Sequence, residues 1–97
     1  MRSLGKNRYN LNGDKNGYWE EYYDNGNLWY KGSYVNGSPD GYWEFYWYDG
    51  NLSSKGSYVN GNRTGYWEFH SDGKLERKGY YEDGYLVDEP LNELLVI

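Results

Sequence analysis

The stretch Gly41–Thr64 reads GYWEFYWYDGNLSSKGSYVNGNRT and is the unit from which most of this 97-residue chain is built. The block Gly17–Asp40 before it and the block Gly65–Asp88 after it repeat its pattern. Gly-Tyr-Trp-Glu recurs at positions 17, 41 and 65, a step of 24 residues. A fixed period of this size is typical of stacked repeat proteins. The sequence therefore predicts three tandem structural repeats.

Each block contains two short runs of alternating side chains on either side of Asn-Gly or Asp-Gly. Such a dipeptide is the strongest local signal for a β-hairpin, because a two-residue turn needs positive φ at both positions. We place Asn25-Gly26 at the tip of the first hairpin. Glu20 then lies opposite Lys31. On the other face of the hairpin, Trp19 lies opposite Gly32.

The second hairpin, with Asp49-Gly50 at its tip, gives the same two kinds of pair. Glu44 lies opposite Lys55, and Trp43 lies opposite Gly56. An opposite-charge pair on one face and an aromatic ring laid over a glycine on the other are both favourable across strands. Because two turns independently give the same pairs, we predict this register throughout.

The third block is one residue shorter before its turn. A two-residue turn at Asp72-Gly73 alone would lose both kinds of pair. We therefore predict a three-residue tip that also includes Lys74, or an equivalent bulge. Either device restores two pairs, Glu68 with Lys78 and Trp67 with Gly79.

The predicted fold is all-β, a single domain formed by a single-layer antiparallel meander of tandem 24-residue hairpin repeats. Short polar loops over Gly37–Asp40 and Gly61–Thr64 reverse the chain between blocks. Residues 1–16 form a half-repeat that caps the N-terminal end with a lone strand over Lys6–Leu11. This strand and the three hairpins give about seven strands in all.

The last residues, 89–97, depart from the repeat and end in four apolar side chains. Pro90 suits the first turn of a helix, and Leu91, Leu94 and Leu95 would share one helical face. We predict a short C-terminal capping helix, with a terminal strand over Leu94–Ile97 or a self-association segment as alternatives.

Alternation along the strands assigns the side chains to two faces. The face predicted to be buried carries Trp19, Trp43, Trp67, Phe45, Phe69, Trp47, Leu28, Leu52, Leu75, Tyr34, Tyr58 and Tyr81. The opposite face carries rows of tyrosine and glutamate, with His70 in the third row. Tyrosine and tryptophan are frequent hot spots in protein interfaces. We predict the partner-binding residues to be Tyr18, Glu20, Tyr22, Trp29, Tyr42, Glu44, Tyr46, Tyr48, Tyr66 and Glu68.

No residues suited to catalysis or metal binding gather in this sequence. His70 is the single histidine, there is no cysteine, and His70 takes the position that Tyr22 and Tyr46 hold in the other blocks. Glutamates in successive blocks are expected about 10 Å apart, which is too far for a retaining pair of catalytic carboxylates and near the outer limit for an inverting pair. Opposed lysines indicate cross-strand ion pairs instead. We predict no enzymatic activity, no metal site and no cofactor.

The net charge of −5 argues against direct nucleic-acid binding and against docking on anionic lipid, both of which need clustered basic residues. No apolar run has the length of a membrane span, and the first residues lack the apolar segment of a signal peptide. The expected location is cytoplasmic.

The repeated pattern Gly-Tyr-Trp-Glu, aromatics, Asn/Asp-Gly, Leu, Lys-Gly-x-Tyr and Asn-Gly resembles MORN repeats (membrane occupation and recognition nexus). It is most similar to the bacterial variant found in antitoxin-like immunity proteins. The resemblance covers Gly17–Asp88 and the half unit before it. It implies an elongated single-layer sheet that acts as a protein-interaction scaffold and, in bacterial relatives, neutralises a toxin or belongs to a secretion or defence locus.

Our main hypothesis is therefore a non-enzymatic, protein-binding scaffold, an antitoxin or immunity protein whose partner is a toxin or effector. One alternative is an acidic phage or mobile-element inhibitor of a nucleic-acid enzyme. A second alternative is an aromatic-rich module that binds carbohydrate or choline, since exposed aromatic rows hold sugars and quaternary ammonium groups. Free edge strands also allow a homodimer.

Overall fold

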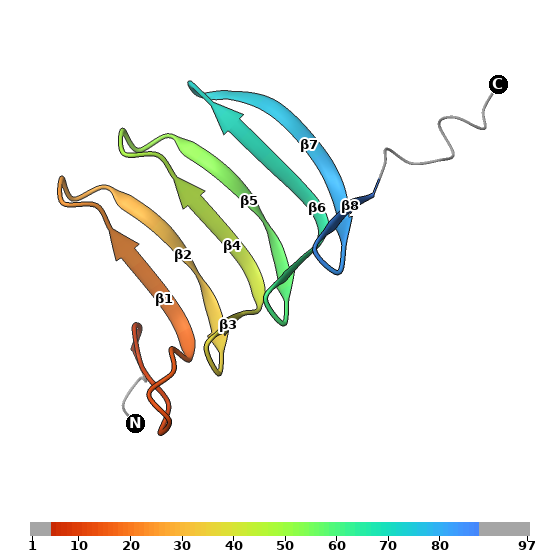
Figure 1. The fold of residues 1–97 in the computed structure, drawn as a ribbon. Coiled ribbons are helices and arrows are strands. Elements are labelled where there is room, and N and C mark those ends of the chain that lie inside the picture. Colours follow the sequence, from red (N-terminus) through yellow and green to blue (C-terminus); the bar gives the residue numbers. More distant parts are fainter. Residues whose placement is uncertain (1–4, 88–97) are drawn as a thin grey trace.

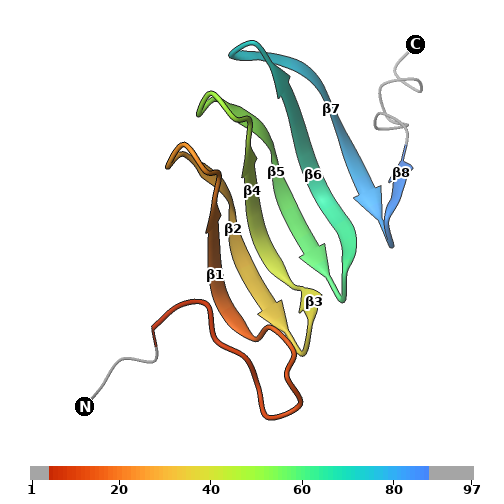
Figure 2. The same ribbon diagram turned by 60° about the vertical axis from the view of Figure 1, so that its left-hand side comes forward.

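The computed structural model describes residues 5–87, and these form one open antiparallel sheet. The strands follow the order β1-β2-β4-β5-β6-β7-β8, and the short β3 pairs with β2 (Figure 1). Their bounds are β1 Gly17–Tyr22, β2 Leu28–Val35, β3 Ser38–Pro39, β4 Gly41–Tyr46, β5 Leu52–Val59, β6 Asn62–Ser71, β7 Lys74–Glu82 and β8 Tyr85–Val87. Figure 2 shows these strands in a single layer. The predicted all-β meander of tandem hairpins is confirmed, whereas the predicted C-terminal cap lies outside the described residues.

The predicted backbone register is confirmed in all three hairpins. Trp43 pairs with Gly56 and Glu44 with Lys55 between β4 and β5. The first hairpin has the equivalent pairs. In the third hairpin, Glu68 pairs with Lys78, as the repeat pattern requires.

The tips of the first two hairpins differ from the prediction of a two-residue turn. In the first, the amide of Tyr23 donates to the carbonyl of Asn27, so the loop has three residues and only Gly26 among them has positive φ (91°). Tyr22 then pairs with Leu28 and Glu21 with Tyr30. The residue between these partners, Trp29, is a bulge that restores the register. The second hairpin repeats the arrangement, with Trp47 bonded to Asn51.

The third hairpin keeps its register by the predicted alternative of a bulge. Asp72 and Gly73 form a two-residue tip with φ of 53° and 76°, flanked by the pair Ser71 and Lys74. The bulged residue is Glu76, because the pairing shifts between the partners Leu75 and Arg77.

The predicted polar loops between blocks are wrong. The chain reverses at Asn36-Gly37 and at Asn60-Gly61, where both residues of each turn have positive φ. Residues that follow each turn pair back at once, as β3 and as the first part of β6. A two-residue turn of this kind matches the twist of the flanking strands, so no longer loop is needed.

The predicted strand over Lys6–Leu11 is also wrong, since this segment forms only an isolated bridge between Tyr9 and Lys15. Asn7 has φ of 59°, which takes it out of the extended region. Its side-chain amide nevertheless pairs with the backbone of Glu20, donating to the carbonyl at 2.9 Å and accepting from the amide at 2.8 Å. The segment thus covers part of the outer edge of β1.

The core is a row of three indoles; Trp43 and Trp67 each pack on the hairpin before their own, and Trp19 packs on the N-terminal segment at Tyr9. A Cβ built on Gly32 would lie 2.1 Å from the ring of Trp43, and one on Gly56 would lie 2.2 Å from the ring of Trp67. Trp43 Nε1 donates to the carbonyl of Ser33 at 3.0 Å. The prediction that Trp43 covers Gly56 is therefore right for the backbone pair and wrong for the ring.

Within residues 5–87, the buried aromatic side chains of the sheet are these three indoles and two tyrosines beside them. The tryptophans of the repeated motif are almost fully buried, together with Tyr30 and Tyr81. Trp47 and Leu75, which we predicted on the buried face, are exposed. Both lie close to hairpin tips, Trp47 just after β4 and Leu75 near the start of β7.

Candidate functional site

The predicted glutamate and tyrosine residues of the first block form a hydrogen-bonded triad on one face of the sheet. Tyr18 donates its hydroxyl proton to Glu20 Oε2 at 2.8 Å, and Tyr22 donates to Glu20 Oε1 at 2.5 Å. Alternation along β1 places the three side chains on the same face because they are two residues apart. Each carboxylate oxygen therefore has a phenol partner.

The same triad recurs in the next two blocks. Tyr42 and Tyr46 donate to the two oxygens of Glu44 at 2.7 and 2.5 Å. In the third block, Tyr66 donates to Glu68 Oε2 at 2.9 Å, and His70 Nε2 lies 2.9 Å from Glu68 Oε1. We call this surface the tyrosine–glutamate face, defined by Tyr18, Glu20, Tyr22, Tyr42, Glu44, Tyr46, Tyr66, Glu68 and His70.

Lysine side chains join neighbouring triads across the blocks. Lys31 Nζ lies 3.3 Å from Glu44 Oε1, and Lys55 Nζ lies 3.8 Å from Glu68 Oε1. We predicted ion pairs within each hairpin, but each of these lysines instead reaches the glutamate of the following block. Each is opposite a glutamate on both sides, because β2 pairs with both β1 and β4 and β5 pairs with both β4 and β6.

The hydrogen bonds hold the glutamates ionised. Bonds from Lys6, Tyr22 and Tyr18 lower the pKa of Glu20 from 4.5 to about 2. Burial raises the pKa of Glu44, but hydrogen bonds from its two tyrosines and Lys31 outweigh it and keep the pKa below its ordinary value. Conversely, burial and the bond to Glu20 raise the pKa of Tyr18 to about 12. At neutral pH, Glu20 and Glu44 are therefore carboxylates, each held by two tyrosine hydroxyl groups.

This arrangement predicts a loss of stability in acid. Unfolded glutamates take up protons near pH 4.5, while folded Glu20 does so near 2, so the unfolded state binds more protons between these values. The contribution of Glu20 to the free energy of unfolding should thus be complete above pH 4.5 and should decrease as the pH falls towards about 2. Urea unfolding at a series of pH values measures this dependence.

Substitution tests whether the triad causes the acid dependence. Glu20→Gln should reduce it, since the amide does not titrate. Glu82→Gln is the matched control, because Glu82 is exposed and accepts no side-chain hydrogen bond within the described part of the chain. Equal acid dependence in both variants and the unmodified chain would contradict the prediction.

The carboxylates of the tyrosine–glutamate face are hydrogen-bonded to the tyrosine hydroxyl groups and, in the third block, to His70. Within residues 5–87, no three histidine, aspartate or glutamate side chains gather closely enough to hold a metal ion. The rings of Tyr18, Tyr42 and Tyr66 remain exposed. What the face presents is a fixed surface of aromatic rings.

Two predicted contact residues, Trp29 and Tyr48, lie away from this face, near the hairpin tips. Trp29 is the bulged residue of the first hairpin and stacks on Tyr23, with ring centroids 5.8 Å apart. Tyr48 donates its hydroxyl proton to Asp24 Oδ1 at 2.7 Å, which links the first two tips. Both rings are exposed.

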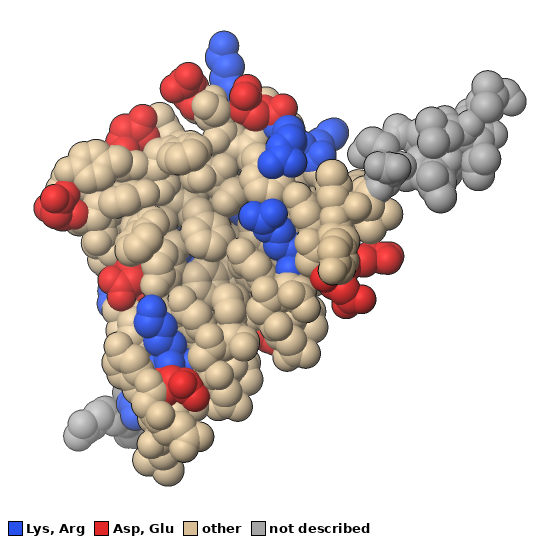
Figure 3. All heavy atoms as spheres, viewed as in Figure 1, with Lys and Arg blue, Asp and Glu red and all other residues tan. Residues whose placement is uncertain are grey.

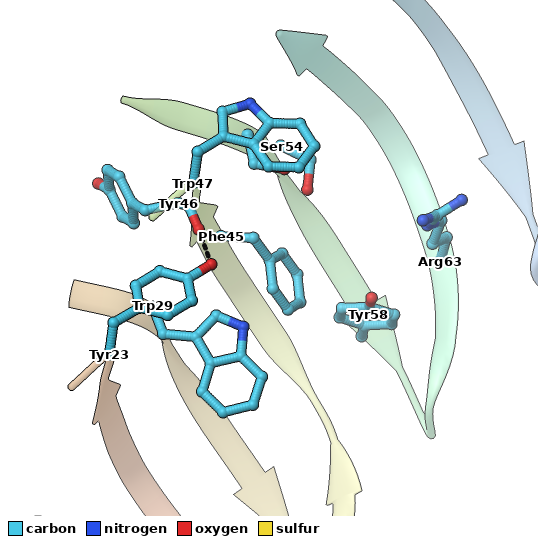
Figure 4. A pocket seen from close by; sticks show the side chains of 9 residues that line it. Tyr23, Trp29, Phe45, Tyr46, Trp47, Ser54, Tyr58 and Arg63 are labelled. Carbon is cyan, nitrogen blue, oxygen red and sulfur yellow. Dashed lines mark hydrogen bonds between the residues drawn. The ribbon is translucent and has the colours of Figure 1, made fainter. Parts of the chain in front are cut away.

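The opposite side of the sheet, which carries the buried indoles, contains a pocket of about 340 Å³ that sequence reasoning missed. We call this side the aromatic face. Figure 4 shows Phe45 between the indoles of Trp29 and Trp47, with Tyr58 and Arg63 across the pocket. Trp29 and Trp47 are 45% and 46% exposed. A sequence signal for Arg63 did exist, since it replaces the Pro39 of the preceding block.

Cations lie over the rings of the aromatic face. Lys15 Nζ is 4.7 Å from the ring centroid of Trp19, Arg63 Cζ is 4.9 Å from that of Trp67, and Arg77 Cζ is 4.3 Å from that of Phe69. Neither arginine has a carboxylate within ion-pair distance among residues 5–87. Figure 3 shows a broad uncharged area crossed by a few basic side chains, with acidic side chains mainly at its margins.

Comparison with known proteins identifies the repeat. The family model described as MORN repeat variant matches residues 15–36, 39–60 and 63–84. No curated protein and no solved structure matches the chain. Among the described residues, none belongs to a helix long and apolar enough to cross a membrane.

Proposed function

The chain belongs to the MORN repeat variant family, whose repeats form protein- or membrane-binding scaffolds, and we propose that it is a non-enzymatic scaffold that binds a partner protein. One observation carries the proposal: large aromatic side chains stay exposed on both sides of a sheet that no second layer covers within residues 5–87. The buried aromatic side chains pack the sheet itself. The exposed ones do not serve that packing, and exposed apolar surface of this kind marks an interaction site.

The contact surface we propose is the tyrosine–glutamate face, without Trp29 and Tyr48, which lie near the hairpin tips. Hydrogen bonds within each triad fix the rings before a partner arrives, which lowers the entropy cost of binding. Tyrosine also supplies a large contact area with few rotatable bonds. Carboxylates between the rings favour a partner with basic side chains at its surface.

We further propose that this partner is a toxin or effector that the chain neutralises. A rigid scaffold without catalytic groups can inhibit by covering the partner's working surface. The acidic charge of the chain, −5, agrees with a basic partner.

Crosslinking and capture from the native host test the proposal. The intact chain should recover a specific protein, and that protein should arrest growth when expressed alone but not when co-expressed with the chain. The triple variant Tyr18→Ala, Tyr42→Ala, Tyr66→Ala should recover it at least tenfold less, in line with loss of several hot-spot contacts.

Tyr85→Ala is the matched control, because Tyr85 is also an exposed tyrosine but lies on β8, outside the proposed surface. It should capture the partner as well as the intact chain does. Recovery of no specific protein would refute the binding function. Capture of a protein that is harmless alone would refute only the toxin assignment.

A further inference from the structure

We propose that the pocket on the aromatic face binds an extended segment of the partner protein in which a large apolar side chain stands beside a carboxylate. This inference rests on the proposed protein-binding function and deepens it by naming the chemistry of the partner. It adds a second contact, on the side of the sheet opposite the tyrosine–glutamate face.

The apolar half of the pocket is wide enough for one large side chain and is already rigid. Trp47 Nε1 donates to the carbonyl of His70 at 3.1 Å, and Tyr23 donates its hydroxyl proton to the carbonyl of Tyr46 at 2.7 Å. Both rings are therefore fixed before any ligand enters. A volume of about 340 Å³ is at the low end for ligand sites, which favours a side chain and its neighbours over a whole cofactor.

The other end of the pocket requires a negative charge. The guanidinium of Arg63 lies over three rings, 4.9 Å from Trp67, 5.1 Å from Phe69 and 5.3 Å from Tyr81. Stacking on ring faces leaves the in-plane N–H donors free to bind a carboxylate in bidentate fashion. Since Arg63 has no acidic partner in the described part of the chain, a ligand carboxylate would supply it.

Charge on the surrounding face reinforces this choice. Lys15 also lies over an aromatic ring of this face, that of Trp19, so the face carries positive charge although the whole chain carries −5. An acidic segment is attracted there, whereas a basic one would meet like charge. Ser53 and Tyr58 also line the pocket and offer hydroxyl groups to a peptide backbone.

The test uses the intact chain and two synthetic peptides that are acetylated and amidated at their ends. One is Ser-Leu-Glu-Leu-Glu-Ser and the other replaces both glutamates by glutamine. The indole N–H resonances of Trp29 and Trp47 should shift in a saturable way with the acidic peptide. The neutral peptide should bind at least tenfold more weakly, because it lacks the charge-assisted hydrogen bonds.

Two variants locate the carboxylate site. Arg63→Gln should weaken binding of the acidic peptide about tenfold or more, and Arg63→Lys should weaken it less, since lysine keeps the charge but loses the planar fork. Arg77→Gln is the matched control, because Arg77 also stacks on Phe69 but does not line the pocket. It should bind nearly as the intact chain does.

Three results would overturn the inference: no indole shift, equal binding of the two peptides, or equal binding by Arg63→Gln. The peptide titration needs no natural partner, so it can succeed where host capture fails. Conversely, a host partner captured equally well by Arg63→Gln would refute this site while leaving the scaffold function intact.

Discussion

Replacing Gly56 with alanine is expected to destabilise the sheet by about 2–3 kcal/mol. The added Cβ would lie 2.2 Å from the indole of Trp67, closer than any real contact. Trp67 is 0% exposed, so its ring has no free space to move into. Urea unfolding should show a lower midpoint with an unchanged dependence on denaturant.

Gly79→Ala provides the matched control. Gly79 occupies the same position in the third hairpin, but its Cβ would meet only the Leu86 Cδ1 at 2.6 Å. The end of an exposed leucine can rotate away, so the cost should stay below about 1 kcal/mol. Equal losses in the two variants would show that backbone freedom at glycine, rather than the ring above it, sets the cost.

The repeat made the backbone register predictable, but it left the direction of the side chains open. Every inner strand has two neighbours, and in a repeat protein both carry the same residue types. Trp43 has Gly56 on one side and Gly32 on the other, just as Lys31 has a glutamate on each side. Pairing rules favour both choices equally, and only the three-dimensional packing selects the preceding glycine for the ring.

The hairpin tips were misread for a related reason. A three-residue loop followed by a one-residue bulge gives the same register beyond the bulge as a two-residue turn. The confirmed pair of Glu20 with Lys31 therefore could not distinguish the two. The φ angles distinguish the two turn types. In the two-residue turn between blocks, Asn36 and Gly37 both have positive φ, whereas in the three-residue tip of the first hairpin only Gly26 does.

The pocket could not be predicted because it depends on residues brought together from four strands and two tips. Arg63 is 34 positions from Trp29 in the sequence and belongs to a different block. The alternation of side chains along a strand assigns Arg63 and Trp29 each to a face of the sheet. It does not show that the bulge at Trp29 turns this ring towards the aromatic face. The triads, by contrast, follow from alternation within a single strand, which is why eight of their nine members were among the predicted contacts.

Replacing Trp43 with alanine is expected to have the largest effect, a loss of about 3–5 kcal/mol. Trp43 is 2% exposed. It packs against four rings within 6.0 Å between centroids: Tyr30, Tyr34, Phe45 and Tyr58. Domains of this size have a total stability of about 5–15 kcal/mol, so the variant should be largely or partly unfolded at modest urea concentrations.

The position of Trp43 makes the loss larger than its area alone suggests. It joins the first block to the second, and in a stack of repeats each block is stabilised mainly by its neighbours. Trp47→Ala is the control, because Trp47 lies in the same block but is 46% exposed, and it should cost only about 1 kcal/mol. Circular dichroism and urea unfolding of both variants measure the two losses of stability. A comparable loss at Trp47 would contradict a core confined to the row of three indoles. The difference we expect would show that this row, rather than a second layer, holds the sheet together.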